Sequence, residues 1–172
     1  MADTFVKIAT VTVGSGGAAT IDFTSIPSTY TDLSLLVSGR GTASEASGGH
    51  YYSIKLNNSS ANFTQRFLQA SVGPSVGSGT SSSSTGNYMT PSDYTSNTFS
   101  NNLTYFPNYA SSANKSFSTD ALAENNSSTT FFLILNALLW SQTAAINQIT
   151  LTPGGGNFAQ YSTATLYGIL KA

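Results

Sequence analysis

The segment SSTTFFLILNALLW, residues Ser127 to Trp140, is the longest apolar stretch of this 172-residue chain and decides its fold class. Phe131 to Leu135 are all apolar, two threonines precede them, and Ser-Gln-Thr closes the segment. Threonine and aromatic residues favour strands over helices. The run is also too short for a bilayer, which needs about 20 apolar residues. The pattern predicts a central strand from Ser128 to Trp140, with both faces buried in a β-sandwich.

Shorter segments in which polar and apolar residues alternate surround this strand. Residues 5–13 predict the first strand, with a bulge near Lys7, and residues 20–24 are predicted to pair with it as a hairpin. Further strands are predicted over 30–40, 51–56, 63–70, 98–107, 115–123, 146–151 and 163–170. This pattern, with no helical period, predicts an all-β fold: an antiparallel, jelly-roll-like β-sandwich of about 8–10 strands.

The length predicts a single domain over residues 1–172. Residues 72–86 are rich in serine and glycine and are predicted to form a flexible loop, because such a run buries too little apolar surface to offset its ordering entropy. Met1 to Val6 are a candidate attachment arm that could add a strand to the sheet edge of a partner. No charged segment followed by an apolar one opens the chain, so we expect no signal peptide.

Hydroxyl and amide side chains take the place of charges in this sequence. Only 8% of the residues are charged, against about 25% in ordinary soluble domains, whereas the chain has 28 Ser, 23 Thr and 14 Asn. Soluble monomers usually depend on surface charge, so this composition favours a subunit of an extracellular or virion assembly over an isolated secreted domain. The net charge of −1 argues against binding to nucleic acid, which requires a basic patch.

The sequence predicts no catalytic, cofactor or metal site. His50 is the single histidine and there is no cysteine, so a metal would lack ligands, and a surface or interface role is expected for His50. No serine lies in a G-x-S-x-G elbow, and the glycine clusters at 14–17 and 154–156 precede no helix. The seven acids fall mostly on polar strand faces or in loops. We therefore expect a protein that is not an enzyme.

Four of the nine tyrosines are candidate contacts for a partner protein or a glycan: Tyr51, Tyr88, Tyr94 and Tyr109. A tyrosine ring can stack on a sugar while its hydroxyl forms hydrogen bonds. Packing in the core or at a subunit interface would explain the same residues equally well, and the sequence leaves both readings open.

Four segments together resemble a family of virion structural proteins from tailed bacteriophages. They are IATVTVGSGGAATIDFTSIPSTYTDLSLLVSGR (8–40), FPNYASSANKSFSTD (106–120), ENN (124–126) and LLWSQTAAINQITLTPGGGNFAQYSTATLYGI (138–169), about half of the chain. The resemblance implies a capsid decoration (cement) protein or a part of a head or tail fibre, and it brings no catalytic residues with it.

Composition and resemblance together predict a non-enzymatic decoration protein that stabilises the phage head. We expect a homo-oligomer, a trimer, whose partners are the major capsid protein or other virion proteins, with no cofactor, nucleic acid or membrane involved. The alternative is a receptor- or glycan-binding component of a tail or head fibre, with a host glycan as partner. Either hypothesis places the chain in the virion, on the capsid surface or in the tail or a fibre.

Overall fold

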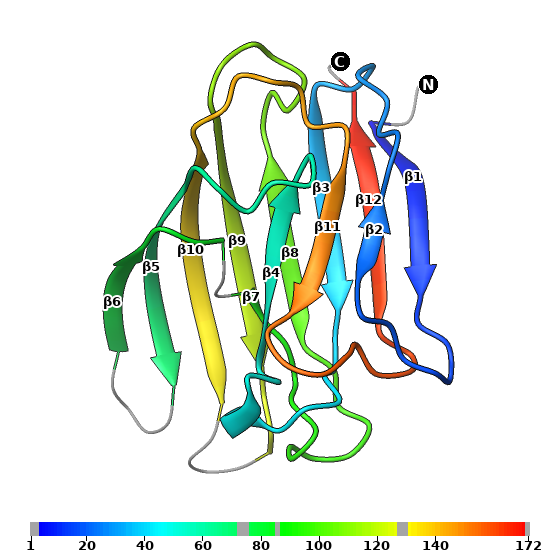
Figure 1. Cartoon of the computed structure of the whole chain (residues 1–172), viewed down its shortest axis with the longest axis vertical. Coiled ribbons are helices and arrows are strands. Elements are labelled where there is room, and N and C mark those ends of the chain that lie inside the picture. Colours follow the sequence, from blue (N-terminus) through cyan, green and yellow to red (C-terminus); the bar gives the residue numbers. More distant parts are fainter. Residues whose placement is uncertain (1–3, 72–75, 85–86, 127–130, 171–172) are drawn as a thin grey trace.

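The computed structural model describes residues 4–71, 76–84, 87–126 and 131–170. The fold is all-β, as the sequence predicts, and two antiparallel sheets pack face to face as a sandwich (Figure 1). The large sheet has the strand order β1 (Phe5–Thr12), β12 (Thr163–Ile169), β3 (Asp32–Ser38), β8 (Asn101–Phe106), β9 (Lys115–Ala123), β10 (Phe132–Trp140), β5 (Phe63–Ser71) and β6 (Val76–Ser81). The small sheet has the order β2 (Ile21–Phe23), β11 (Ile149–Pro153), β4 (Tyr51–Leu56) and β7 (Asn87–Tyr88).

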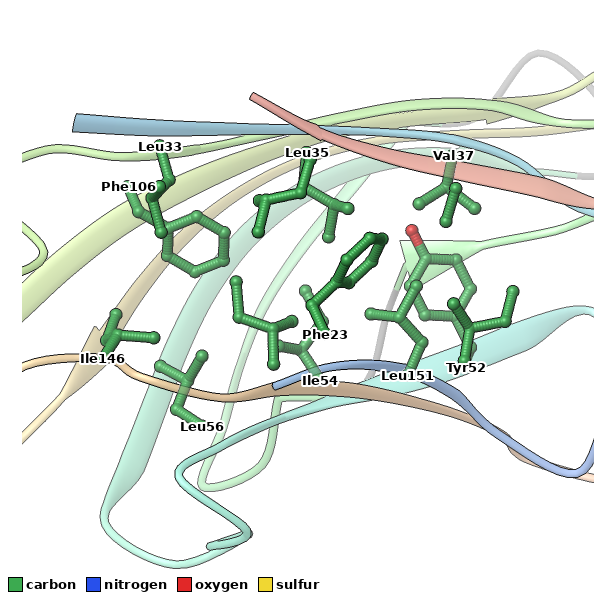
Figure 2. Packing of buried hydrophobic residues seen from close by; sticks show 14 of the residues in the cluster. Phe23, Leu33, Leu35, Val37, Tyr52, Ile54, Leu56, Phe106, Ile146 and Leu151 are labelled. Atoms are coloured by element: carbon green, nitrogen blue, oxygen red, sulfur yellow. The ribbon is translucent and has the colours of Figure 1, made fainter. Parts of the chain in front are cut away.

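The main core lies between the small sheet and the middle of the large sheet. Alternate residues of each strand point inward, so that the two layers interdigitate as expected for stacked sheets. Figure 2 shows these side chains meeting from both sheets and from the segment before β11: Phe23, Leu33, Leu35, Val37, Tyr52, Ile54, Leu56, Phe106, Ile146 and Leu151. The described chain has twelve strands rather than 8–10, and its jelly-roll connectivity stays a prediction.

The apolar segment that decides the fold is an interior strand, but only one of its faces is buried. β10 lies between β9 and β5, and Phe132, Ile134 and Leu138 point toward the small sheet. Leu133 and Leu135 point the other way and each expose 51% of their surface. The prediction of two buried faces is therefore wrong, because no strand in the described ranges lies over the outer face of the large sheet. Residues 128–130 of the predicted strand lie outside the described ranges.

The predicted hairpin between the first two strands is also wrong. β1 pairs with β12 in the large sheet, whereas β2 pairs with β11 in the small sheet. The connecting segment crosses between the layers: the amide of Val13 donates to Ser162 O (2.9 Å) and that of Ala18 to Phe158 O (3.0 Å). Hydrogen bonds to residues far away in the sequence therefore determine the course of this segment, and the local turn does not form a hairpin. The predicted bulge is confirmed, between Lys7 and Ala9.

The serine- and glycine-rich region contains an edge strand that was not predicted from the sequence. β6 pairs with β5 from Gln65 opposite Ser81 to Ala70 opposite Val76, so the predicted flexible loop is wrong for residues 76–81. The ring of Phe67 lies on Gly79, where it covers a backbone that has no side chain of its own. Residues 72–75 and 85–86 of the predicted loop lie outside the described ranges.

The predicted N-terminal arm is described only in part. Phe5 and Val6 already pair with Ile169 and Gly168 of β12, so they belong to the large sheet. Residues 1–3 are not among the described residues, and the attachment arm stays a prediction.

Two glycines of β6 provide a test of this packing. A Cβ at Gly79 would come within 2.5 Å of the Phe67 ring, whereas a Cβ at Gly77 would meet only Gln69 Cγ at 4.0 Å. We expect Gly77→Ala to raise the free energy of unfolding by about 0.5–1 kcal/mol, because it reduces the entropy of the unfolded chain. Gly79→Ala should lower it by about 1–3 kcal/mol through overpacking. Urea titration measures both, and equal stabilisation by the two variants would contradict the placement of Phe67.

The fully buried Tyr52 provides a second test, at alkaline pH. Burial raises the pKa of Tyr52, outweighing the opposite effect of a hydrogen bond from Asn102. The folded state therefore holds the tyrosine proton more tightly than the unfolded state does. Its contribution to stability is complete below about pH 10 and is lost as the pH rises further, by up to about 1.4 kcal/mol per pH unit. We expect Tyr52→Phe to flatten this decline in chemical denaturation between pH 9 and 11; parallel curves would refute the assignment.

Candidate functional site

The outer face of the large sheet carries a contiguous group of exposed leucines, which we call the leucine face: Leu36, Leu68, Leu103, Leu122, Leu133 and Leu135. They expose between 42% and 54% of their surface. Leu36 lies directly opposite Leu103, Leu122 opposite Leu133, and Leu68 opposite Leu135. Toward β6 the face is hollowed into a shallow groove of about 780 Å³, whose lining includes Arg66, Leu68, Thr80, Leu135 and Ala137.

Two opposite charges lie on this apolar face. Asp120 faces Leu103 on one side and Leu135 on the other. Arg66 lies on β5, one cross-strand row away, and its guanidinium donates to the backbone oxygen of Gln65 (3.1 Å). Within the described ranges neither side chain forms an ion pair. The leucine face thus presents an unpaired carboxylate and an unpaired cation.

The small sheet covers only part of the inner side of the large sheet. It does not extend over the edge strands β5 and β6 (Figure 1). A groove of about 350 Å³ forms at this step, which we call the aromatic groove. Its lining combines rings with amide and hydroxyl groups: His50, Tyr51, Gln65, Phe67, Gln69, Thr80, Ser81, Tyr88 and Ile134. Most of these residues come from strands of both sheets, β4 and β7 on one side and β5, β6 and β10 on the other.

Three of the four tyrosines predicted from the sequence meet at this groove or directly behind it. Tyr51 and Tyr88 line the groove, and Tyr94 stacks on Phe132 with ring centroids 6.2 Å apart. Phe132 also lies 4.5 Å from Tyr88 and stacks on His50 at 5.2 Å. The buried ring of Phe132 therefore fixes the positions of the other rings.

Tyr109, the fourth candidate, does not belong to this site. Its side chain is fully buried in the main core, and its hydroxyl donates to Pro27 O. Tyr109 is therefore a core residue and not a contact residue of the groove. Tyr88 and Tyr94 are also largely buried. Among the four candidate tyrosines, Tyr51 is therefore the one whose side chain is partly exposed.

The polar atoms of the groove have unused hydrogen-bonding capacity. Gln65 is only 3% exposed, its Nε2 donates to Asn136 Oδ1 (2.8 Å), and its Oε1 accepts no hydrogen bond within the described chain. The Tyr88 hydroxyl donates to Gln69 Oε1 (2.9 Å), so the Gln69 amide nitrogen remains available as a donor. His50 Nδ1 lies 3.0 Å from Glu45 O. Because a carbonyl can only accept, Nδ1 carries a proton, and Nε2 of the neutral ring is an acceptor.

The two glutamines and the leucine face were not predicted from the sequence. Phe63, Gln65, Phe67 and Gln69 alternate along β5, so an amide at every second inward position was the available signal. For the leucine face, the signal was leucine at outward positions of several strands. Both patterns gain meaning only when the neighbouring strands are known.

The loop that carries Tyr94 is held by Arg40. The guanidinium donates to four backbone carbonyl oxygens at 2.9–3.1 Å, those of Ser92, Tyr94, Thr95 and Thr98. Burial lowers the pKa of Arg40, an effect that Asp93 opposes. The Tyr94 hydroxyl in turn donates to Glu45 Oε2 (3.3 Å), and burial together with Glu45 raises the pKa of Tyr94. Arg40 therefore orders this loop mainly through backbone oxygens, and the charge of Asp93 favours its cationic form.

Two findings bear on other kinds of site. In the part of the chain that the structure describes, no three His, Asp or Glu side chains gather as a metal site would require. No helix in those ranges has the length and hydropathy to cross a bilayer.

No family model, curated protein or solved structure matches this chain.

The role of Arg40 can be tested with a conservative change. We expect Arg40→Lys to lower the free energy of unfolding by about 1–3 kcal/mol, because an ammonium group cannot span four carbonyls. Amides of residues 92–98 should exchange with deuterium faster. Arg66→Lys is the matched control, since that guanidinium donates to one carbonyl, and it should change stability by less than about 0.5 kcal/mol. Equal effects of the two changes would contradict this role.

Proposed function

We propose that this chain is a non-enzymatic structural subunit of a tailed-phage virion, a capsid decoration protein that associates with copies of itself through the leucine face. The observation that carries the proposal is the group of six leucines exposed together on one side of the large sheet. Contiguous apolar patches on soluble proteins mark interaction surfaces, whereas single exposed leucines do not.

Association of copies through the leucine face would bury apolar surface that the isolated chain exposes to water, and this burial is favourable. Burying a whole leucine side chain stabilises by about 1.5–3 kcal/mol, so covering the exposed half of each contributes about 1 kcal/mol. Six such residues on a sheet face supply enough to offset part of the entropy lost on association. The face is also built from strands that are already paired, so it needs no rearrangement before binding.

The charges on the face favour a second copy of the chain as the occupant. Asp120 lies among leucines and Arg66 lies near them, and each lacks an ionic partner in the described chain. When copies meet through this face, Asp120 of one can approach Arg66 of another while the leucines are buried. The net charge of −1 keeps repulsion between copies small.

The resemblance to phage virion proteins and the low charge support a role on the particle. A trimer with its leucine faces turned toward a common axis would bury the apolar surface and present polar edges to the major capsid protein. In that arrangement, the work of the protein is mechanical: it holds neighbouring capsid subunits together through protein contacts, without catalysis.

Substitutions on the leucine face test the association. We expect the purified wild-type chain to have the mass of three chains by size exclusion with light scattering, and Leu103→Ser/Leu135→Ser to have the mass of one. Thermal unfolding of the variant should still be cooperative, since both positions are exposed in the single chain. Tyr161→Ser is the control, because Tyr161 is 67% exposed but lies outside the face, and it should leave the mass unchanged. A wild-type monomer at tens of micromolar would refute the proposal.

The location on the particle is a separate test. Quantitative mass spectrometry and immunogold labelling of purified phage should find hundreds of copies distributed over the head. A few copies confined to the tail or to one vertex would refute the decoration role.

A further inference from the structure

We propose that the aromatic groove binds a neutral saccharide, with the sugar ring stacked on Tyr51 beside His50 and its hydroxyls bonded to Gln65 and Gln69. The rings of this groove lie on the inner side of the large sheet, whereas the six leucines lie on its outer side; the two grooves share only Phe67 and Thr80. Saccharide binding at this groove does not require the proposed assembly.

The rings provide the apolar half of sugar recognition. One face of a pyranose presents C–H groups, which pack against an aromatic ring of suitable orientation. Tyr51 and His50 are partly exposed at the groove, and their rings lie 5.0 Å apart in an edge-to-face arrangement. Phe132 and Tyr88 support them from behind. The stacking surface is therefore formed before a ligand arrives.

The amides provide the polar half. Gln65 Oε1 is a buried acceptor without a hydrogen bond in the described chain, and leaving such a group unpaired costs about 1–3 kcal/mol. Because this oxygen is buried in the free chain, a sugar hydroxyl can donate to it once the Gln65 side chain rotates toward the groove that it lines. The free donor of Gln69 and the acceptor Nε2 of His50 complement a second and a third hydroxyl. A ligand with both donors and acceptors on one ring uses all three groups.

The lining excludes other ligand classes. None of the residues that form the groove is Asp, Glu, Lys or Arg, so a phosphate or a charged sugar would find no countercharge. An apolar peptide side chain would bury Gln65 without pairing it. The volume of about 350 Å³ falls at the small end of ligand sites, which run from about 300 to 1,000 Å³, and suits one sugar unit.

Gly154, which directly follows β11 of the small sheet, packs against the ring of Tyr51. The ring of Tyr51 lies directly on Gly154, and any side chain at position 154 would overlap it. The amide of Gly154 also donates to Tyr51 O (2.9 Å). The ring is therefore confined to one orientation, which reduces the entropy lost when a sugar stacks on it.

Saturation-transfer NMR on the purified chain tests the proposal. The probes are glucose, galactose, mannose and N-acetylglucosamine at millimolar concentration, with glucuronic acid as the charged comparison. We expect transfer to the ring C–H protons of at least one neutral sugar. Tyr51→Ala should weaken its binding about tenfold, and Tyr51→Phe should stay within about threefold of wild type, because stacking is kept.

Gln65→Leu tests the polar contact separately. It removes the acceptor at nearly constant volume, together with the hydrogen bond to Asn136 Oδ1. We therefore expect a fold that persists with about 1–3 kcal/mol less stability and an affinity that falls about tenfold. Tyr161→Ala, outside the groove, should bind like wild type, and thermal unfolding checks that each variant is folded. The proposal is overturned if no neutral sugar binds, if glucuronic acid alone binds, or if Tyr51→Ala and Gln65→Leu bind as tightly as wild type. None of these results would alter the mass measured for the leucine-face variants.

Discussion

The structure depends on one mismatch: a sheet of eight strands is covered by a sheet of four. Where the sheets overlap, inward residues of both form the main core, including Leu35, Ile54 and Leu151. Where they do not overlap, β5 and β6 extend past the small sheet and leave the step that becomes the aromatic groove (Figure 1). Among the described residues, no second layer covers the outer side of the large sheet. Both candidate surfaces are thus consequences of unequal layers rather than of added loops.

Few charges remain in this chain, and two of the cations stabilise loops through backbone oxygens. Arg40 donates to four carbonyls of the segment that carries Tyr94. Lys115 is 2% exposed, and its ammonium group donates to the carbonyls of Ser111 (2.7 Å) and Ala113 (2.5 Å). Burial lowers the pKa of Lys115 accordingly. Backbone carbonyls take the place of acidic partners, which allows a chain with seven acids to order its long connections.

Much of the fold was predictable because the sequence patterns that indicate it are local. The alternation in β3 identifies Leu33, Leu35 and Val37 as inward residues, and the phase change in β1 identifies the bulge beside Lys7. The site was predictable only in part. Tyr51, Tyr88 and Tyr94 were recognised by residue type and do converge, but Tyr109 is of the same type and lies in the core. Residue type alone does not tell a ring at a groove from a ring in a core.

The sequence by itself determined the all-β class, the positions of most strands and the side chains that alternate, since each follows from a two-residue period along the chain. Only the tertiary structure decided the strand partners, because β1 with β12 and β2 with β11 are pairings between opposite ends of the chain. It also decided that Leu133 and Leu135 stay exposed, which depends on whether a second layer lies above them. Gly79 in β6 is the same case: a glycine-rich strand persists there because β5 and the Phe67 ring lie beside it. The local sequence pattern determines which residues can form a strand, and contacts with residues distant in the sequence determine their strand partners and their exposure.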